Sequence, residues 1–382
     1  MNIAFDAKRA FENNTGLGNY SRSLIASLIQ AYPHHNYFLM APKLTDMFKP
    51  LGGNVNIITP RGGHKMVPSL WRSKLVTKDL QRLHVDLYHG LSHEIPVGIE
   101  HTGIKTVVTI HDLIFEHYPG QYKPADVLIY RRKFKNACTH ADKIIAISKQ
   151  TKDDLIELYK VPEAKIEIVY QACDPKYQVH LSETEREQIR AKYKLPQQFF
   201  LSVGSVIERK GLLSICEALN TLKGKLDIPL VVIGTGGKYM DRVKAYIASN
   251  GLADRVIFLS EQSTSQEAGY VTGSDFPAIY QLSTALIYPS MYEGFGLPVA
   301  EALFSQTPVI TSNVSCLPEA GGDAAMYVTP GSIAQLAAAM TTVATDSGLR
   351  SDMIKKGLAH ARLFLPHYCA ANTMKVYESL IK

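Results

Sequence analysis

Short apolar runs alternate with longer amphipathic segments along most of this chain. Runs such as Lys105–Ile110 and Pro229–Gly234 are rich in β-branched residues, which is typical of strands buried on both faces of a sheet. The segments between the runs repeat apolar residues with the period of an α-helix. Strands that alternate with helices predict βαβ units, and therefore an α/β fold with parallel sheets.

The alternating pattern restarts once, near the middle of the chain. Glu167–Tyr170 is the last predicted strand of the first series, and a polar stretch separates it from a new first strand at Phe199–Gly204. Inside that stretch, Glu183–Tyr193 is charged and has helical periodicity. A chain of 382 residues is long enough for two domains with separate cores. We therefore expect one domain over residues 1–176 and another over residues 177–365.

One stretch, Glu293–Glu301, combines the features of an anion site. It follows a predicted strand that ends at Ser290, and Pro298 suits the first turn of the next helix. Gly294 and Gly296 allow the backbone to approach a ligand closely. Free N–H groups at the start of a helix bind anions, helped by the helix dipole. The turn therefore predicts a phosphate-binding site.

Two carboxylates flank this predicted site. Glu293 precedes the helix, and Glu301 lies about one turn inside it. Carboxylates would repel a phosphate alone, whereas sugar hydroxyls would donate hydrogen bonds to them. The combination favours a ligand that carries both phosphate and sugar, namely a nucleotide-sugar.

The pattern Glu-x7-Glu, with Glu-Gly-Phe-Gly-Leu-Pro inside it, resembles the signature of the retaining family-four glycosyltransferases of GT-B fold. The likeness extends over nearly the whole chain, and it is to bacterial mannosyltransferases in particular. It implies two Rossmann-like domains that face a central cleft, with residues 1–176 on the acceptor side and residues 177–365 binding the donor. It also implies that a C-terminal helix, at about residues 366–382, returns to the first domain.

The same resemblance gives roles to the Glu293–Glu301 stretch. It implies that Glu293 contacts the hydroxyls of the donor sugar and that Glu301 holds the ribose hydroxyls. The backbone amides of Phe295, Gly296 and Leu297 would contact sugar and phosphate.

A second glycine turn carries two cations. Gly204–Gly211 joins a predicted strand to a helix and contains Arg209 and Lys210. Their charges suit a leaving diphosphate, because Lys supplies a point charge and Arg a planar fork. The resemblance implies that this motif binds both phosphates. The family often has Arg directly after the first glycine, where this chain has Ser205.

A third glycine turn, Thr15–Tyr20, follows the first predicted strand and precedes a helix predicted from Ser21. Its glycines, Gly16 and Gly18, suit a backbone cradle for phosphate or acceptor. A dinucleotide fingerprint is a poor match, since the third glycine and a later acidic residue are missing. The turn resembles the family's Gly-x-Gly-x-Tyr motif at the mouth of the interdomain cleft, so we place both glycines among the donor-binding residues.

Histidines at the carboxyl ends of predicted parallel strands are catalytic candidates, because ligands bind beyond these ends. His111 and Asp112 follow one strand, and His89 ends the strand before it. Ile-His-Asp-Leu resembles the family's His-Asp motif, which implies that His111 approaches the donor sugar. Asp112 either orients His111 or stabilises the loop. We take His111, Glu293 and Lys210 as the catalytic candidates.

The basic segment Arg61–Lys78 contains the chain's only tryptophan, Trp71. Such a segment suits a membrane headgroup interface, with Trp and Leu inserted and Lys and Arg on anionic heads. It would also suit contact with an acceptor. The alternative is a loop and helix whose Trp71 belongs to the core, with solvated charges around it.

Composition narrows the partners. A net charge of +6 and a pI of about 8.8 favour anionic partners, such as nucleotide diphosphates or a membrane surface, without a nucleic-acid footprint. Five scattered cysteines suggest neither a disulfide framework nor a zinc site, so we expect a cytoplasmic protein, with peripheral contact at the inner face of the membrane as an option. No Asp-x-Asp pair occurs in the sequence, so we expect no metal and no cofactor beyond the nucleotide-sugar.

The resulting hypothesis is retaining transfer of a hexose, with mannose favoured, from GDP-mannose or a UDP-hexose to a hydroxyl of a glycan or lipid-linked acceptor. Three alternatives stay open. They are a sugar phosphorylase on the same fold, an epimerase of nucleotide-sugars, and a non-enzymatic nucleotide-binding protein.

Overall fold

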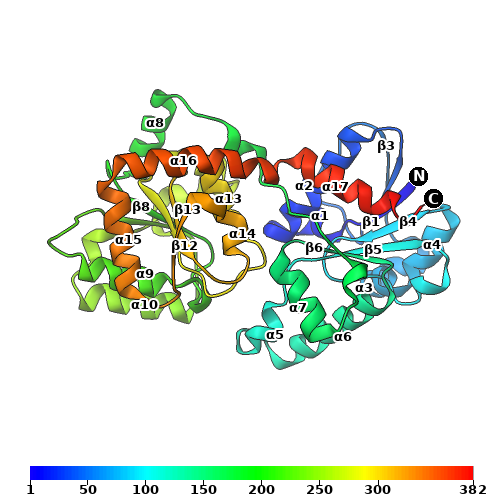
Figure 1. Cartoon of the computed structure of the whole chain (residues 1–382). Coiled ribbons are helices and arrows are strands. Elements are labelled where there is room, and N and C mark those ends of the chain that lie inside the picture. The colour runs from blue at the N-terminus through cyan, green and yellow to red at the C-terminus, as the bar shows by residue number, and fades with distance from the viewer. Residues whose placement is uncertain (382) are drawn as a thin grey trace. The chain divides into compact units, whose positions relative to one another are not determined.

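The computed structural model describes residues 1–381, and these residues form two compact units. The first unit comprises Met1–Ala172 together with the segment that begins at Phe364, and the second comprises Cys173–Leu363. Each unit is built on a parallel sheet covered by helices (Figure 1). The prediction of an α/β fold with two Rossmann-like sheets is confirmed.

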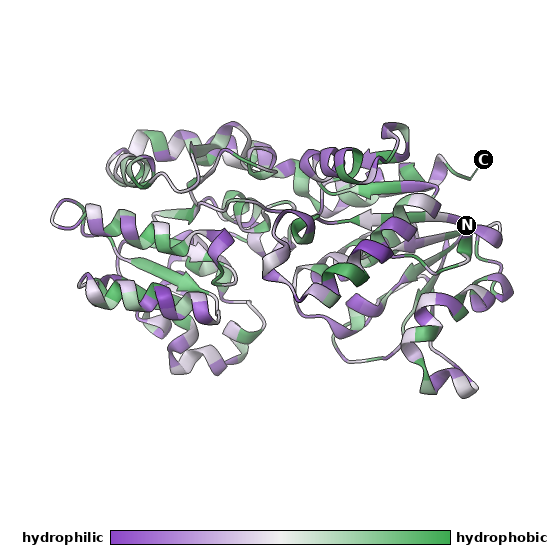
Figure 2. Ribbon diagram, turned by 90° about the horizontal axis from the view of Figure 1, so that it is seen from below, coloured by the Kyte–Doolittle hydropathy of each residue, from purple (hydrophilic) through white to green (hydrophobic). Residues whose placement is uncertain are grey.

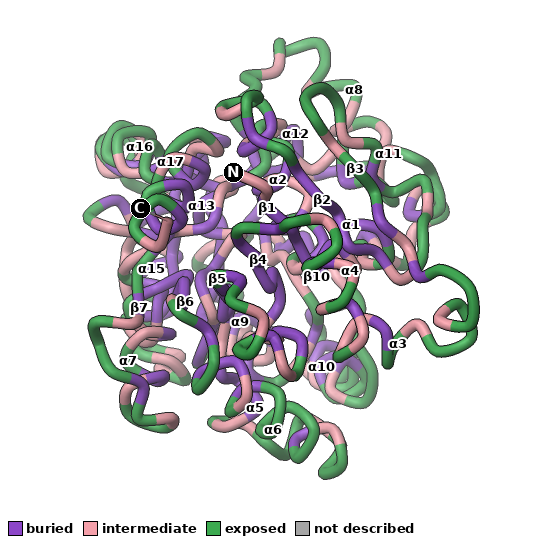
Figure 3. The backbone as a smooth tube through the Cα atoms, turned by 90° about the vertical axis from the view of Figure 1, so that its right-hand side faces the viewer, coloured by how far each residue is buried: buried purple, intermediate pink, exposed green. Residues whose placement is uncertain are grey.

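The sheet of the first unit has seven parallel strands in the order β3-β2-β1-β4-β5-β6-β7. Its central strands are buried, as the purple of β1, β4, β5 and β6 in Figure 3 shows. The strands are β1 (Asn2–Asp6), β2 (Asn36–Met40), β3 (Asn54–Ile58), β4 (Leu87–Gly90), β5 (Lys105–Ile110), β6 (Lys143–Ala146) and β7 (Ile166–Ile168).

Both faces of this sheet carry a hydrophobic core, because successive side chains of a strand point to opposite faces. Ile3 and Phe5 belong to one core, and Ala4, between them, belongs to the other. The helices are α1 (Lys8–Glu12), α2 (Gly16–Ala31), α3 (Pro68–Leu70), α4 (Val76–Arg82), α5 (Ile114–His117), α6 (Pro124–His140), α7 (Lys149–Tyr159) and α17 (Pro366–Glu378), with a π-helical turn at Trp71–Leu75.

The predicted glycine loop at Thr15–Tyr20 is wrong in one respect, because α2 begins at Gly16 and not at Ser21. The side chain of Asn13 causes the early start: its Oδ1 accepts from the amides of Thr15 at 2.9 Å and of Gly18 at 3.2 Å. Gly18 is required for packing, since a Cβ there would lie 1.8 Å from the Asn13 carbonyl oxygen. The amide of Gly18 is therefore already hydrogen-bonded within the protein.

The C-terminal helix α17 belongs to the first unit and packs against α2, which confirms the predicted return. Tyr377 of α17 is fully buried, and its hydroxyl lies 2.6 Å from Nδ1 of His89 on β4. Nε2 of His89 lies 2.8 Å from the Thr109 hydroxyl, which is 2.9 Å from that of Tyr20. His89 therefore links three elements of the core, and its role is structural.

We expect Tyr377→Phe to lower the free energy of unfolding by about 1–2 kcal/mol, because it leaves Nδ1 of buried His89 without its partner. Urea denaturation of the full chain measures the loss. Tyr368→Phe is the matched control, since Tyr368 is on the same helix and 47% exposed. Equal stability of the two variants would contradict the role of His89.

The sheet of the second unit has six parallel strands in the order β10-β9-β8-β11-β12-β13. Apolar residues dominate its strands, which Figure 2 shows in green between helices of mixed colour. The strands are β8 (Phe200–Val203), β9 (Leu230–Ile233), β10 (Val256–Phe258), β11 (Ala285–Tyr288), β12 (Val309–Ser312) and β13 (Ala325–Val328).

The first α-helix of the second unit is the one predicted at Glu183–Tyr193, which α8 confirms with the same bounds. A capping box starts it: Ser182 Oγ accepts from the Glu185 amide, and the Glu185 carboxylate accepts from the Ser182 amide. The helices after it are α9 (Leu212–Thr221), α10 (Lys238–Ser249), α11 (Ala268–Val271), α12 (Phe276–Leu282), α13 (Leu297–Phe304), α14 (Leu317–Gly321), α15 (Ile333–Thr345) and α16 (Ser347–Ala361).

Candidate active site

The Glu293 turn connects the carboxyl end of β11 to the start of α13, as predicted. Gly296 is the residue before the first helical position and has φ +95°. A Cβ at Gly296 would lie 2.9 Å from the Leu317 side chain, so glycine is needed both for the backbone conformation and for the packing. Pro298 lies in the first turn of α13, where its missing N–H leaves no bond unmade.

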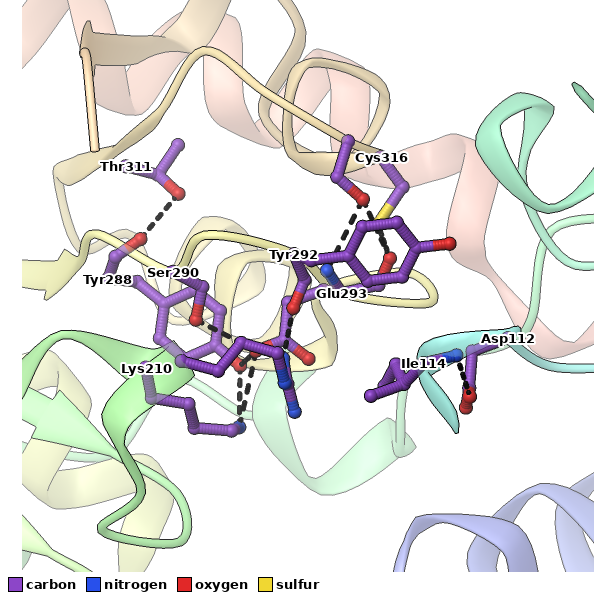
Figure 4. Close-up of polar contacts among 11 residues, drawn as sticks. Asp112, Ile114, Lys210, Tyr288, Ser290, Tyr292, Glu293, Thr311 and Cys316 are labelled. Atoms are coloured by element: carbon purple, nitrogen blue, oxygen red, sulfur yellow. Dashed lines mark hydrogen bonds and ion pairs between the residues drawn. The ribbon is translucent and has the colours of Figure 1, made fainter. Parts of the chain in front are cut away.

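The Glu293 carboxylate lies in a closed set of polar contacts, which Figure 4 shows. Its Oε1 accepts from the hydroxyls of Tyr288 at 3.0 Å and Ser290 at 2.8 Å. The same oxygen lies 2.8 Å from a guanidinium nitrogen of Arg209 and 3.6 Å from Nζ of Lys210. Two hydroxyls and two cations therefore gather on one buried carboxylate.

These contacts fix the charge of Glu293. Burial alone would raise the pKa of this carboxyl, but Lys210 and Arg209 outweigh burial and bring the pKa below its usual value. The hydroxyls of Ser290 and Tyr288 act in the same direction. Glu293 is therefore ionised at neutral pH although its residue is only 8% exposed.

The backbone of Glu293 is held by the loop that follows β12. The Ser315 hydroxyl donates to the Glu293 carbonyl at 2.8 Å and accepts from its amide at 3.3 Å. The thiol of Cys316 also donates to that carbonyl at 3.1 Å, and Thr311 donates to the Tyr288 carbonyl at 2.8 Å. Side chains of β12 and of the loop after it therefore hold the turn in place.

Lys210 approaches the site through space left by a glycine. Its Nζ donates to the Tyr288 hydroxyl at 2.7 Å, and its side chain is 19% exposed. A Cβ at Gly204, at the end of β8, would lie 2.8 Å from this nitrogen. Gly234, at the end of β9, packs so closely that a Cβ there would lie 1.9 Å from the Gly204 carbonyl oxygen. Glycines at two strand ends therefore give the ammonium its position.

Arg209 differs from Lys210 in its surroundings. It is 6% exposed, and its guanidinium donates to the Tyr292 carbonyl as well as pairing with Glu293. The sequence suggested Arg209 and Lys210 as diphosphate ligands. The structure brings both next to Glu293, and their action on a diphosphate stays a prediction.

Glu301 lies inside α13, and its carboxylate has a different hydrogen-bond partner from that of Glu293. Its Oε2 accepts from the Tyr280 hydroxyl at 2.7 Å. Burial raises the pKa of this carboxyl, against the hydrogen bond from Tyr280. The predicted roles of Glu301 and of the amides of Phe295 and Leu297 stay predictions.

Sequence reasoning missed the hydroxyl groups of this site. Tyr288 and Ser290 contact the Glu293 carboxylate directly, and Ser315 holds its backbone. Tyr288 and Ser290 stand at the carboxyl end of a predicted strand, which is the signal that could have found them. No comparable signal marks Ser315, because its contact joins residues 22 positions apart.

His111 follows β5 in the first unit, as predicted, and is 5% exposed. Its Nε2 lies 2.9 Å from the Leu91 carbonyl oxygen, so that nitrogen carries the proton. Burial, with the nearby His93, lowers the pKa of His111 well below its usual value. His111 is therefore a neutral imidazole at pH 7, and its predicted contact with a donor sugar stays a prediction.

Other residues of the first unit have structural contacts. Asp112 Oδ1 accepts from the Ile114 amide at 3.0 Å at the start of α5, which supports its loop-stabilising role (Figure 4). Ser148 is the N-cap of α7 and accepts from the Thr151 amide. Gly16 and Gly18 belong to this unit, and their part in donor binding stays a prediction.

Trp71 is fully buried, so the interpretation that inserts it into a membrane is wrong. Its Nε1 donates to Asp79 at 2.8 Å, and it belongs to the hydrophobic core that also contains Ala4 and Phe134. The alternative given above, a core tryptophan, is confirmed. Burying an indole of this size stabilises the core more than partial lipid contact would.

Arg72, next to Trp71, organises a buried ionic network. Its guanidinium donates to Asp6 from Nε at 2.9 Å and lies 2.5 Å from Oε1 of Glu94. Oε2 of Glu94 lies 2.8 Å from Nζ of Lys133 on α6. Burial would raise the pKa of Glu94, but Arg72 and Lys133 lower it to about 2.

We expect Glu94→Gln to lower the free energy of unfolding at pH 7 by about 2–3 kcal/mol. A carboxyl whose pKa is lowered in the folded protein stabilises the fold at every pH above its ordinary pKa of 4.5. This stabilisation is lost as the pH falls from 4.5 toward 2. The difference in free energy of unfolding between wild type and variant should therefore become smaller from pH 5 to pH 3, as urea titrations can measure. Glu157→Gln, at an exposed position of α7, is the control. A gap that does not change with pH would contradict this assignment.

None of the helices in residues 1–381 is both long and apolar enough to cross a bilayer. Nor do those residues include a group of three or more His, Cys, Asp or Glu side chains that could hold a metal ion.

Comparison with known families gives two matches that together cover most of the chain. Residues 15–177 match the family described as Glycosyltransferase Family 4. Residues 185–360 match the family described as Glycosyl transferases group 1.

Individual relatives agree with these matches. The O-antigen chain mannosyltransferase B of Escherichia coli is 29% identical over 77% of this chain and 74% of its own length. The serotype-specific mannosyltransferase WbdA of Escherichia coli is 28% identical over 72% of this chain, which spans only 34% of that longer protein.

A solved structure has the same fold. That of HepE from Anabaena, in complex with UDP, superposes with a TM-score of 0.73 at 15% identity, covering 99% of this chain and 100% of HepE. With both family matches, this chain belongs to the family-four glycosyltransferases of GT-B fold and is similar to bacterial mannosyltransferases.

Proposed function

We propose that the protein transfers a hexose from a nucleotide-sugar to a hydroxyl group of a glycan or lipid-linked acceptor, with retention at the anomeric carbon. The observation that carries the proposal is the Glu293 carboxylate, ionised and held by Arg209, Lys210 and two hydroxyls at the start of α13. An anion site and a fixed carboxylate in one turn suit phosphate and sugar hydroxyls together.

Charge neutralisation of the leaving diphosphate is assigned to Lys210 and the amides at the start of α13. Lys210 is partly exposed and its ammonium is held by the Tyr288 hydroxyl, whereas Arg209 is engaged with Glu293 and the Tyr292 carbonyl. Groups already in place stabilise developing charge without reorganising. We therefore propose a reaction that needs no divalent metal and no cofactor.

Retention is proposed to occur by substitution on the same face of the sugar. Glu293 is a poor candidate for a covalent nucleophile, since two hydroxyls and two cations hold its charge and lower its pKa. In this scheme the acceptor oxygen bonds to the anomeric carbon, the bond to the diphosphate breaks, and a diphosphate oxygen takes the acceptor proton. Glu293 orients the sugar hydroxyls.

Mannose is the favoured sugar, and GDP-mannose the favoured donor, because both relatives reported above are named as mannosyltransferases. A UDP-hexose is the second proposed donor, because the structure of HepE is a complex with UDP. A growing polysaccharide is the proposed acceptor, since one of these relatives is named for the O-antigen chain.

A peripheral contact with an anionic membrane is part of the proposal for a lipid-linked acceptor. Met66 is 87% exposed and Leu70 48% exposed, and Arg61 and Lys65 stand on the same segment. Co-sedimentation with phosphatidylglycerol vesicles tests this contact, which Met66→Asp should weaken.

The experiment that tests the function screens the full chain against GDP-mannose, GDP, UDP-glucose, UDP-galactose and UDP by thermal shift. The donor that stabilises the protein is then incubated with an O-antigen fragment, and the product's anomeric configuration is read by NMR, with and without EDTA. Retention and insensitivity to EDTA are expected. An inverted product, or cleavage of a disaccharide by inorganic phosphate without any nucleotide, would overturn the proposal.

A further inference from the structure

The strand β3 forms one edge of the sheet in the first unit, and no strand among residues 1–381 pairs with its outer side. Its sequence, Asn54–Ile58, contains neither a charged residue nor a proline. Natural sheets protect their edges with charges, prolines or very short strands, because an open edge can pair with another chain. The opposite edge has this protection, since β7 is three residues long and carries Glu167, which pairs with Lys143 at 2.8 Å.

The crossover that leads into β3 covers this edge only thinly. Parallel strands are usually joined through a helix, but residues 41–53, which join β2 to β3, contain none. Phe48 of this crossover packs edge-on against Phe11, with 5.7 Å between ring centroids. Leu51, in contrast, is 88% exposed, and Ile57 on β3 is 41% exposed. Large apolar side chains exposed beside an open edge indicate contact with a further protein surface.

The backbone of β3 presents hydrogen-bonding groups to the outside at two positions. The Ile58 carbonyl accepts from the Ala41 amide at 2.9 Å, so the backbone groups of Ile58 face β2. Successive residues of a strand direct these groups to opposite sides of the strand. The N–H and C=O groups of Val55 and Ile57 therefore point away from β2, where a further strand can bond to them.

This edge is complementary to itself. If two β3 strands pair antiparallel with Asn56 at the centre, Val55 of each copy lies opposite Ile57 of the other, and the two residues exchange N–H···O=C bonds. Opposite residues in such a pair place their side chains on the same face, so the valines and isoleucines of both copies pack together. The Asn56 side chains meet on the other face as uncharged amides, so no like charges oppose each other.

We propose that β3 is an interface between two copies of this chain, which pair their β3 strands antiparallel about a two-fold axis at Asn56 and so join their sheets into one. A two-fold interface requires each contact to occur twice, which the pairing of Val55 with Ile57 satisfies. A single pair of short strands is a small interface, so we expect a dissociation constant on the order of 10 μM. The inference is independent of the proposed function, because it uses no residue of the Glu293 site.

Sedimentation equilibrium of the full chain, over about a hundredfold range of concentration around that value, should show a monomer–dimer equilibrium. Ile57→Lys places a charge on the open edge and should raise the dissociation constant by about tenfold or more. The matched control is Ile168→Lys, the same substitution at a 37% exposed position of β7 on the opposite edge. It should form dimers as the wild type does.

A disulfide experiment tests the register of the pairing. The backbone groups of Asn56 face β2, so the two copies of this residue form a pair without mutual backbone bonds. Cα atoms in such a pair are about 4.5 Å apart, which a disulfide can span. Asn56→Cys should therefore give a covalent dimer when oxidised with diamide. Asn54→Cys, also exposed on β3, lies opposite Ile58 of the other copy and should not. The chain's own cysteines are buried.

Three results would overturn the inference. They are a wild-type chain that stays monomeric over the whole concentration range, an Ile57→Lys variant that forms dimers as tightly as Ile168→Lys, and equal covalent dimer formation by the two cysteine variants. Tm of each lysine variant separates loss of the dimer from loss of the fold. If Ile57→Lys lowers Tm, the cysteine variants decide the question, because both replace exposed residues.

Discussion

Lys210→Ala is expected to lower the rate of sugar transfer by about 10²–10³-fold, the effect of removing one fixed group that stabilises developing charge. Lys210 is the more exposed of the two cations beside Glu293, and its ammonium is held by the Tyr288 hydroxyl at 2.7 Å. Stability should change little, because Arg209 still neutralises the Glu293 carboxylate at 2.8 Å. The measurement is kcat with saturating donor, together with Tm.

Lys225→Ala is the control for this substitution, since Lys225 is exposed on the same unit. It removes the same charge from the protein without touching the site. Lys210→Arg should recover only part of the rate, because a planar fork cannot replace a point charge in the space that Gly204 leaves. A Lys210→Ala enzyme that turns over like wild type would show that the diphosphate is neutralised elsewhere.

Much of the fold was predictable because most strands and helices of the two units are marked by patterns within their own residues. A β-branched run such as Lys105–Ile110 predicts its own strand, and Glu183–Tyr193 has both a helical period and a capping residue at Ser182. The start of α2 was not predictable from its glycines. There the side chain of Asn13 accepts from the amides of Thr15 and Gly18, and this residue lies outside the glycine motif.

The site was predictable only in part. Glu293, Gly296 and Lys210 stand in motifs with a fixed spacing, and the structure brings Glu293 and Lys210 together. The pairing of Arg209 with Glu293 joins residues 84 positions apart, so no local pattern contains it. The charge state of His111 could not be predicted from the sequence either, because its neutral form results from burial and from contact with His93.

The pair formed by Arg209 and Glu293 gives the second large prediction. Either Arg209→Met or Glu293→Gln alone should lower the free energy of unfolding by about 3–5 kcal/mol, because each leaves a buried charge without its partner at 2.8 Å. Both single variants should also lose most transfer activity. Urea denaturation and a transfer assay on the same preparations give the two readouts.

The double variant separates the two roles of Glu293. Arg209→Met with Glu293→Gln removes both charges, so its loss of stability should be smaller than the sum of the two single losses by about 2 kcal/mol. Activity should stay lost, because a carboxamide restores the packing but cannot give the ionised carboxylate that orients the donor hydroxyls. Recovery of activity along with stability would mean that Glu293 acts only through the fold. Additive losses of stability would mean that the two charges are solvated independently and that their 2.8 Å contact contributes nothing.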